Sequence, residues 1–515
     1  MAEYKKVNKW LVTLAVMLPT LMEIIDTSVA NVALPHMQGS FSAGADEITW
    51  VLTSYLVSNA VVLPMTGWLA SVFGRKRFLI SCITLFTIAS FLCGAAPNLG
   101  MLIFFRVLQG AAGGALQPMS QAIMLETFPT SERGLAMAIF GVGAMFGPII
   151  GPALGGWITD NISWRWIFYI NIPTGFVAVI MAKYFVFDPP YIKKKVMSID
   201  YIGLGLLVVG LGALQVVLDK GEREDWFSSP FIVIFAATTV IALVCLIYYE
   251  LHHEHPVVHL RLFKDRSFAA GNFLMFMFGF CLYSTITLIA LLLQTLMGYD
   301  ATLAGMVLAP GGIATLLMMP MVGVALKKYD GRKIVFAGLI IGSTALFQMS
   351  RFTLDASYWT FVWPRVVLGM GLAMIFVPLT TLTFASIPKE EMGNATGFFN
   401  LLRNMGGGIG IGISATILQR YSQFYQNVLV THVNPYNPVF QQNFNQMKAG
   451  LIAKGVAPTA AGSKSLAMLY AQIQRQAGML AYNRVFFILC IAFVSVIPFL
   501  LLLKRAKGQG PAGIH

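Results

Sequence analysis

Long apolar runs recur from one end of this chain to the other, and they constrain its fold more than any other feature. Each run is about 18 to 25 residues long, which is enough for a helix to cross a hydrocarbon core about 30 Å thick. Only 11% of the residues are charged and 57% are hydrophobic, whereas roughly 25% of the residues in a soluble protein are charged. The sequence therefore predicts an all-α integral membrane protein without a soluble domain.

We predict fourteen transmembrane helices. They span approximately residues 10–33, 48–72, 78–96, 100–125, 134–158, 166–187, 199–218, 230–250, 268–294, 302–326, 333–350, 357–384, 394–418 and 483–504.

The connectors between these helices alternate between basic and neutral or acidic, as the positive-inside rule requires. Arg75–Arg77, Lys193–Lys195 and Arg261–Arg266 all fall on the same side as the lysine-rich N-terminus. Both termini are therefore predicted to be cytoplasmic. The same distribution explains the net charge of +13. Because aromatic residues do not interleave with these basic residues, we expect the lipid bilayer, and no nucleic acid, as the charged partner.

An internal repeat divides the chain into two halves. Arg106, with Gly110 after it, returns as Arg365, with Gly369 after it, 259 residues later. Two further pairs of segments repeat with offsets of 256 to 259 residues, namely Pro64–Lys76 with Pro320–Lys333 and Glu132–Ala136 with Glu391–Ala395. This regularity is typical of a secondary transporter with a substrate cavity between two equivalent bundles.

The repeat also predicts the domain organisation. We expect an N-terminal six-helix bundle at 1–190, an inserted helix pair with its connectors at 191–265, and a C-terminal six-helix bundle at 266–515. The last bundle includes an outer loop at about 419–482. Residues 467–480 of this loop are compatible with a short amphipathic helix, so partner docking and a plain surface excursion both remain open.

Two carboxylates, Glu23 and Asp26, lie within the first apolar run. A buried acid in a membrane is costly unless it is paired, protonated or facing water, so it indicates a functional site. The two are three residues apart and share one helix face. Arg106 lies within the fourth predicted helix, where an unpaired positive charge is also costly.

Other polar residues within the predicted spans are candidates for the transport pathway, and each is equally compatible with a hydrogen bond between helices. They are Asn31, Gln117, Gln121, Gln294, Asn400, Arg403 and Asn404.

The fifth predicted helix carries glycines at every fourth position, interrupted by two prolines. These residues are Gly143, Gly147, Pro148, Gly151, Pro152 and Gly155. The glycines form a smooth groove that lets another helix approach closely, while the prolines bend the helix. The combination favours packing that serves a function over packing alone.

This glycine–proline run resembles the antiporter motif of drug–proton exporters in the major facilitator superfamily. Gly67–Lys76 is similar to the superfamily loop between helices 2 and 3, with Gly67, Gly74, Arg75 and Lys76 kept. Ser71 stands where the pattern usually has an Asp. Glu126 is a possible partner for the basic pair on the same side. The resemblance implies the major facilitator fold, two six-helix bundles, here with two inserted helices.

Three further segments, Asp26–Pro35, Leu102–Gly110 and Trp164–Pro173, are similar to the fourteen-helix EmrB/QacA-type branch of drug:proton antiporters. The outer segment Asn434–Pro438 resembles EmrB-type pumps in particular. The resemblance implies proton-coupled efflux of hydrophobic, often cationic, drugs across a bacterial inner membrane. It also implies a tripartite system with a periplasmic, EmrA-like adaptor and an outer-membrane channel.

Helices 1 and 4 face the central cavity in this superfamily, so the resemblance pairs Asp26 with Arg106 as a protonation-sensitive couple. A static structural pair is the alternative. Glu23 is either a ligand for cationic substrates or a neutral, hydrogen-bonded side chain.

We expect no cofactor beyond a proton gradient, because the sequence has no nucleotide-binding loop. The histidines between 252 and 259 lie in a basic connector, and we interpret them as solvated residues and not as a metal site. No catalytic constellation stands out, so an enzyme is not expected. A proton-coupled nutrient or metabolite transporter and a membrane receptor remain as alternatives.

Overall fold

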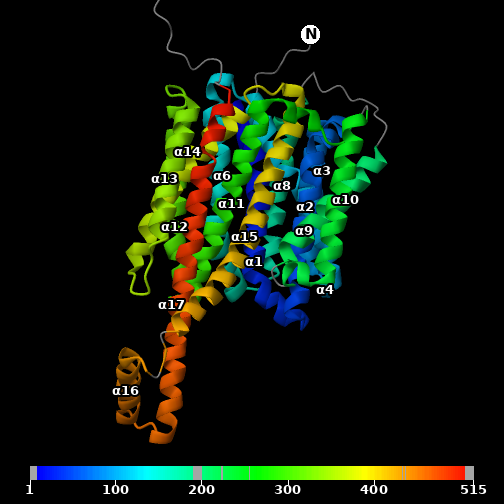
Figure 1. The fold of residues 1–515 in the computed structure, drawn as a ribbon. Helices are drawn as coiled ribbons and strands as arrows, with labels where there is room; N and C mark the ends of the chain where they lie inside the picture. The colour runs from blue at the N-terminus through cyan, green and yellow to red at the C-terminus, as the bar shows by residue number, and fades with distance from the viewer. Residues whose placement is uncertain are drawn as a thin grey trace, which may run out of the picture.

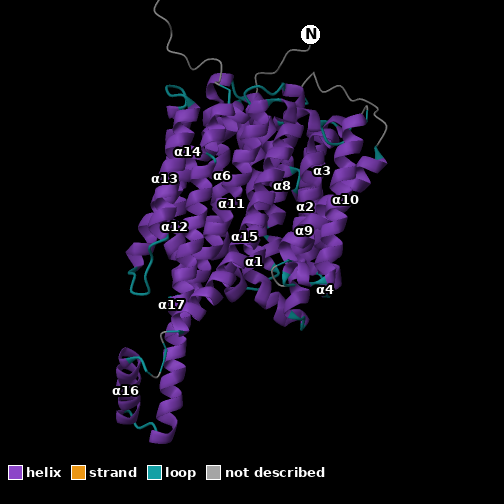
Figure 2. Ribbon diagram, viewed as in Figure 1, coloured by secondary structure: helices purple, strands orange, loops and turns teal. Residues whose placement is uncertain are grey.

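The computed structural model describes residues 8–188, 200–221, 224–253, 256–431, 433–434 and 436–504, and every regular element in these ranges is helical (Figure 2). Thirteen of the described helices are long and apolar enough to cross a membrane. A further helix of 29 residues, α6, lies among them (Figure 1), in the position of the fifth predicted span. The all-α, multi-pass membrane fold is thus confirmed. The basic connector at 193–195 lies outside the described residues.

The N-terminal half of the chain, which we define as α1 to α8, forms one group of packed helices. These are α1 (Lys9–Phe41), α2 (Ala45–Phe73), α3 (Arg75–Ala95), α4 (Leu99–Gly113), α5 (Leu116–Thr127), α6 (Arg133–Asn161), α7 (Trp166–Tyr169) and α8 (Asn171–Phe185), with the 3₁₀ turn η1 (Thr130–Glu132) before α6.

Two predicted spans, 100–125 and 166–187, are each interrupted by a proline. A proline has no N–H to donate to the carbonyl four residues before it. Pro118 leaves the Gly114 carbonyl without this bond, and α4 gives way to α5 at that point. Pro173 has the same relation to Tyr169, where α7 ends.

The inserted pair consists of α9 (Tyr201–Lys220) and α10 (Pro230–His252), which pack against each other, with η2 (Trp226–Ser228) between them. Helix α9 contacts both α2 and α15. The Lys220 Nζ donates a hydrogen bond to Thr49 on α2 at 2.6 Å, and the Trp226 indole N–H donates to Thr416 on α15 at 2.8 Å. The pair therefore contacts both halves of the molecule.

The C-terminal half, defined as α11 to α17, follows the 3₁₀ turn η3 (Leu260–Lys264). Its elements are α11 (Arg266–Thr295), α12 (Ala301–Ala325), α13 (Gly331–Met349), α14 (Tyr358–Thr383), η4 (Lys389–Glu391), α15 (Met392–Val430), α16 (Pro438–Ala453), α17 (Pro458–Ser495) and η5 (Ile497–Leu502).

The segment at 419–482, predicted as an outer loop with a short helix possible at 467–480, is mostly helical in its described residues. Helix α15 continues to Val430, α16 follows, and α17 begins at Pro458. Figure 1 shows α16 and the first part of α17 projecting from the bundle at the end opposite to the start of α1. An open groove in this helical extension is lined by apolar and amide side chains, among them Leu429, Phe440, Leu469, Ile473 and Gln476.

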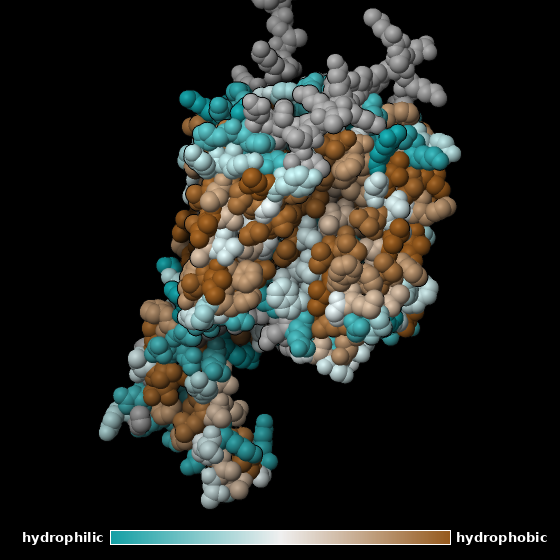
Figure 3. Space-filling view, turned by 90° about the vertical axis from the view of Figure 1, so that its right-hand side faces the viewer, coloured by the Kyte–Doolittle hydropathy of each residue, from teal (hydrophilic) through white to brown (hydrophobic). Residues whose placement is uncertain are grey.

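The surface supports the membrane assignment. Figure 3 shows a broad hydrophobic band across this face of the bundle, with hydrophilic side chains gathered at its two ends. The outward-facing helices expose large apolar side chains to this band, for example Phe176 at 67% and Ile241 at 64%. Such exposure is costly in water and favourable in lipid, so the band marks the membrane-facing surface.

The two halves cross closely at the end of the bundle where α1 begins. Helix α2 packs on α15, and α12 packs on α6. At the first crossing, a Cβ built on Gly67 would meet the Asn394 amide oxygen at 2.0 Å. At the second, one built on Gly134 would meet Leu326 at 2.9 Å and the Gly323 carbonyl at 3.3 Å. Because Gly67 and Gly323 are repeat partners, the two crossings are equivalent contacts of a pseudo-symmetric pair.

Candidate functional site

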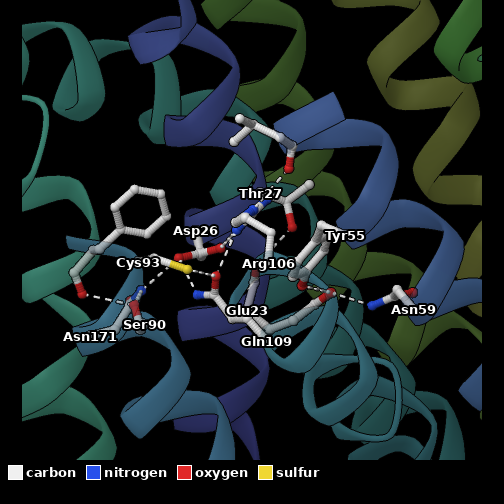
Figure 4. A network of polar contacts seen from close by, with 12 residues as sticks. Glu23, Asp26, Thr27, Tyr55, Asn59, Ser90, Cys93, Arg106, Gln109 and Asn171 are labelled. Carbon is white, nitrogen blue, oxygen red and sulfur yellow. Dashed lines mark hydrogen bonds and ion pairs between the residues drawn. The ribbon is translucent and has the colours of Figure 1, made fainter. Parts of the chain in front are cut away.

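Asp26 and Arg106 form an ion pair in the interior of the N-terminal half, as the resemblance implied (Figure 4). The Arg106 Nη1 donates to Asp26 Oδ2 at 2.8 Å, and the two side chains are 0% and 1% exposed. Gln109 and Asn171 donate to the other carboxylate oxygen at 2.8 and 2.7 Å. The carboxylate thus accepts three hydrogen bonds, which compensate for its burial.

Arg106 is held from several sides. Its Nε donates to the Val51 carbonyl at 3.1 Å, and Nη1 also reaches Gln109 Oε1 at 2.8 Å. The Tyr55 ring lies 4.1 Å from the guanidinium carbon. The Arg106 Nη2 is buried without a hydrogen-bond partner among the described residues. One donor of the guanidinium is therefore uncommitted.

Glu23 lies one helical turn from Asp26 and is also buried, but its donors are neutral. The Tyr55 hydroxyl donates to Oε1 at 3.1 Å and Asn59 donates to the same oxygen at 3.3 Å. Gln117 donates to Oε2 at 2.6 Å. Tyr55 therefore connects Glu23 with the Asp26–Arg106 pair, because its ring covers Arg106 while its hydroxyl donates to Glu23 (Figure 4).

Gln117 extends the network into the C-terminal half. Its amide nitrogen donates to Glu23, and its amide oxygen accepts from Arg403 Nη2 at 2.8 Å. Arg403, on α15, also donates to the Asn404 side-chain oxygen at 3.3 Å. A neutral amide thus separates a carboxylate of one half from a guanidinium of the other.

The remaining predicted pathway residues fall into two groups. Asn400 on α15 donates to the Gln121 side chain on α5 at 2.7 Å, so these two form a second polar contact between the halves. Asn31 is exposed and donates to the Thr27 carbonyl of its own helix. Gln294 is exposed near the end of α11. The structure does not bring these last two residues into the network.

The predicted partner of Arg75 is confirmed as a contact. Arg75 and Glu126 form a bidentate pair with distances of 2.7 and 2.6 Å, and both side chains are buried. Ser71, in place of the usual Asp, donates to the Trp68 carbonyl of its own helix. The backbone N–H of Lys76 donates to Asp188 at 2.8 Å, so an acid from beyond α8 meets the first turn of α3.

The glycine face of α6 packs against α1. Cβ atoms built on Gly143, Gly147, Gly151 and Gly155 would all come within 2.8 Å of α1 side chains. The close approach predicted for this helix is therefore present, and its neighbour is the helix that carries Glu23 and Asp26. The side chains of Pro148 and Pro152 are not among those described.

Sequence reasoning missed four side chains of the network, namely Tyr55, Asn59, Gln109 and Asn171. Gln109 follows Arg106 by three residues, so helical periodicity alone could have placed it beside the ion pair. Asn171 lies within the Trp164–Pro173 motif. Tyr55 and Asn59 carry no comparable signal, because the packing of α2 against α1 and α4 brings them to the acids.

Among the described residues, no group of His, Cys, Asp or Glu side chains is arranged to hold a metal ion. His259 lies 3.2 Å from Glu391, and His253 lies 4.0 Å from Asp200.

The network combines ionisable and neutral polar side chains. Two buried carboxylates lie beside one buried guanidinium, and each carboxylate has several hydrogen-bond donors. Protonating Asp26 would remove the counter-charge of Arg106, and Tyr55 would transmit the change to Glu23. The arrangement therefore suits ion coupling better than bond-making chemistry.

Residues 16–411 of the chain match the Major Facilitator Superfamily. The chain is 36% identical over 489 residues to the multidrug export protein EmrB of Haemophilus influenzae, covering 95% of this chain and 94% of that protein. It is 34% identical over 504 residues to the EmrB of Escherichia coli, covering 98% and 97%. It is 35% identical over 508 residues to the fatty acid resistance protein FarB of Neisseria gonorrhoeae, also covering 98% and 97%.

Two solved structures share the fold. The human organic anion transporter MFSD10 has a TM-score of 0.61 at 12% identity, covering 94% of this chain and 99% of that one. The proton:xylose symporter XylE has a TM-score of 0.59 at 12% identity, covering 97% of both chains.

Proposed function

The chain belongs to the major facilitator superfamily, among its EmrB-type transporters, and from this premise we propose that it exports drugs by proton-coupled alternating access. Its substrates are hydrophobic and often cationic compounds. The relatives named as multidrug export proteins are similar over nearly the whole chain, which supports this class of substrate. The driving force is a proton gradient, without a cofactor.

The buried Asp26–Arg106 pair carries the proposal. With Asp26 ionised, the pair is neutral overall and holds α1 to α4 through a charge-assisted hydrogen bond of 2.8 Å. A proton on Asp26 leaves Arg106 without a counter-charge in an interior where an unpaired charge is costly. The pair then rearranges, and the preference between the two access states changes.

The close helix crossings between the two halves are the part of the molecule that switches between the two access states. Gly67 against Asn394 and Gly134 against Gly323 bring the halves together at one end of the bundle. The Gln117–Arg403 contact joins the halves beside Glu23. A change at Asp26 can bias these contacts because Tyr55 and Glu23 connect them to Arg106.

Replacing Asp26 tests proton coupling directly. Asp26→Asn keeps the size of the side chain but cannot ionise, so proton-driven ethidium efflux from reconstituted vesicles should fall to background. Ethidium binding at equilibrium should remain. Asp355→Asn, at an exposed loop position, serves as the matched control and should transport normally. Wild-type efflux rates in Asp26→Asn vesicles would exclude the proposal.

A substitution of Glu23 tests whether this residue recognises the substrate or takes part in proton coupling. Its carboxylate is bonded only by neutral donors in the described structure, so it is the acid free to neutralise a cationic substrate. Glu23→Gln should weaken binding of cationic drugs by about tenfold, the scale of one charge-assisted interaction, and leave neutral drugs unaffected. Glu390→Gln, at an exposed site on η4, is the control. Equal weakening of neutral and cationic drugs would argue for a structural role.

We further propose that the pump lies in a bacterial inner membrane with both termini in the cytoplasm, and that it works with a periplasmic adaptor and an outer-membrane channel. The basic connectors near the chain ends support this orientation. The helical extension, with its partly apolar groove, is the surface we assign to the adaptor. Drug resistance of cells with and without a co-expressed adaptor tests the assembly, and a pump lacking residues 432–457 should lose the adaptor-dependent part.

A further inference from the structure

The inserted pair contacts both halves at the end of the bundle opposite to the start of α1. At the other end α2 and α15 cross each other directly, because a Cβ built on Gly397 would lie 2.3 Å from the Leu63 carbonyl oxygen and one on Gly67 would meet Asn394. Several turns further along, α9 contacts both of these helices (Figure 1). One inserted helix therefore bridges the two halves where α2 and α15 no longer cross.

The attachment of α9 to α2 is made by charged groups. The Lys220 ammonium donates to Thr49 at 2.6 Å and lies 5.1 Å from the centre of the Trp50 ring. The Asp219 carboxylate accepts a hydrogen bond from Thr53. Lys220 is 6% exposed, and a buried ammonium in a membrane protein is costly to separate from its partners. Since hydrogen bonds to ionised groups are the strong ones, α9 is firmly held on α2.

The attachment to α15 is neutral and rests on small residues. The Trp226 indole N–H donates to Thr416 at 2.8 Å, and a Cβ built on Gly412 would lie 3.1 Å from the same indole ring. One turn earlier, a Cβ on Gly408 would lie 3.7 Å from the Leu218 Cβ. A neutral hydrogen bond and a glycine surface hold less firmly than paired charges. The α15 side is therefore the weaker of the two attachments.

The backbone at Trp226 also favours release. Asp225 and Trp226 have φ values of 53° and 50°, in the left-handed region that residues other than glycine rarely occupy. Such strain persists only where the surrounding contacts impose it. The Trp226 backbone N–H donates to the Gly221 carbonyl at 2.7 Å, and its indole is held on α15. Movement of the indole away from α15 allows the strained backbone to relax.

We propose that the inserted pair stays on α2 and separates from α15 in each transport cycle, with Trp226 as the releasable contact. The inference rests on the alternating access of the proposed function. Rocking of one bundle against the other separates α2 from α15 at one end and brings them together at the opposite end. Because α9 contacts both helices at that opposite end, it cannot keep both contacts through the movement.

Distances between pairs of spin labels test this separation without drug. One label replaces Phe231 at the start of α10, and its partner replaces either Glu47 on α2 or Gln419 on α15, all of them exposed. Gly67→Ala places a methyl group against Asn394 and so favours opening of the end where α1 begins. In this variant the distance from Phe231 to Gln419 should change, and the distance from Phe231 to Glu47 should not.

A third label pair reports whether the end where α1 begins has opened. It joins Phe73 of the N-terminal half to Tyr329 of the C-terminal half, which are 55% and 63% exposed. An unchanged distance from Phe231 to Gln419 in molecules that have opened would overturn the proposal. A change in the distance from Phe231 to Glu47 would overturn it as well. Should Gly67→Ala leave this end closed, cross-linking decides.

Two disulfides in a chain without its native cysteines form a matched pair. Gly408→Cys with Leu218→Cys ties α9 to α15, and the Cβ separation of 3.7 Å suits a disulfide. Gly212→Cys with Val57→Cys ties α9 to α2, where a Cβ on Gly212 would lie 3.6 Å from Val57. Oxidation should lower ethidium efflux about tenfold or more for the first tie and less than about twofold for the second, because only the first blocks the second access state.

Reduction with dithiothreitol should restore efflux in the first variant, so each protein is its own control. Equal efflux by its oxidised and reduced forms would overturn the proposal, and so would a block by the tie between α9 and α2. If the reduced proteins and the cysteine-free parent also fail to pump ethidium, the result counts against the proposed function. The spin-label distances then still decide whether the inserted pair separates from α15.

Discussion

Gly67→Ala is a direct test of the crossing between α2 and α15. A Cβ at this position would lie 2.0 Å from the Asn394 side-chain oxygen and 2.4 Å from the Asn394 backbone nitrogen. The side-chain oxygen can rotate away, but the backbone nitrogen cannot. Ordinary contact begins at 3.4 Å, so the α15 backbone has to move away by about 1 Å.

The cost of this movement applies only while the two helices cross. Inserting a methyl group into a well-packed contact costs about 1 to 3 kcal/mol. Because 1.4 kcal/mol is tenfold in an equilibrium constant, the ratio of closed to open molecules at this end should fall by roughly 5- to 150-fold. Gly134→Ala, at the equivalent crossing, should have a smaller effect, since its nearest neighbour is the end of the Leu326 side chain at 2.9 Å.

Double electron–electron resonance, which measures the distance between two spin labels, reports this population directly. Spin labels replace two exposed residues at this end of the bundle, Phe73 at the end of α2 and Lys389 before α15. The label-to-label distribution should shift to longer distances in Gly67→Ala. Gly305→Ala adds the same methyl group in α12, where nothing lies within 4 Å, and should leave the distribution unchanged. A folded Gly67→Ala protein with the wild-type distribution would refute the reasoning.

Two further predictions concern the same end of the molecule. Arg75→Gln leaves the buried Glu126 without its bidentate partner and should destabilise the protein by about 3 to 5 kcal/mol, measured as a lower melting temperature. The double variant Arg75→Gln/Glu126→Gln should recover most of this lost stability. Equal melting temperatures of the single and double variants would contradict the prediction. The hydrogen bond from Lys9 lowers the pKa of Glu132 below its usual value of 4.5. This contact therefore stabilises the fold above that pH and is lost as pH falls through the lowered pKa. The melting temperature of wild type should drop more between pH 6 and about pH 3 than that of Lys9→Gln, and parallel curves would show that the contact contributes nothing.

The membrane helices could be predicted from the sequence because each rests on a strong local signal. Hydrophobic length identifies a span without knowledge of its neighbours. The pairing of Asp26 with Arg106 was implied by the family resemblance, and Glu126 was a possible partner for the basic pair in the loop that resembles the superfamily motif. The other side chains of the network were not predicted. Tyr55 and Asn59 have no feature in the sequence that singles them out before α2 packs against α1 and α4.

Most of the helical extension was not predicted, because its helices are polar. Residues 419–482 lack the sustained apolar face by which a helix is normally recognised. Capping signals were present, since Asn437 precedes Pro438 and the Asn437 side chain accepts a hydrogen bond from the Val439 backbone. A proline at the first position of a helix, as at Pro438 and Pro458, is a start signal and not a sign of a loop.

The placement of Gln117 between Glu23 and Arg403 affects how fast the two halves can separate. Direct separation of a carboxylate from a guanidinium in a low-dielectric interior would leave two bare charges, at a cost of several kcal/mol for each ion. With the amide between them, parting breaks one hydrogen bond to a charged group, worth about 1.5 to 3 kcal/mol. Gln117 and Glu23 both belong to the N-terminal half, so separation of the halves does not require their hydrogen bond to break. In the proposed alternating-access cycle, separation at this contact therefore does not require an ion pair to dissociate.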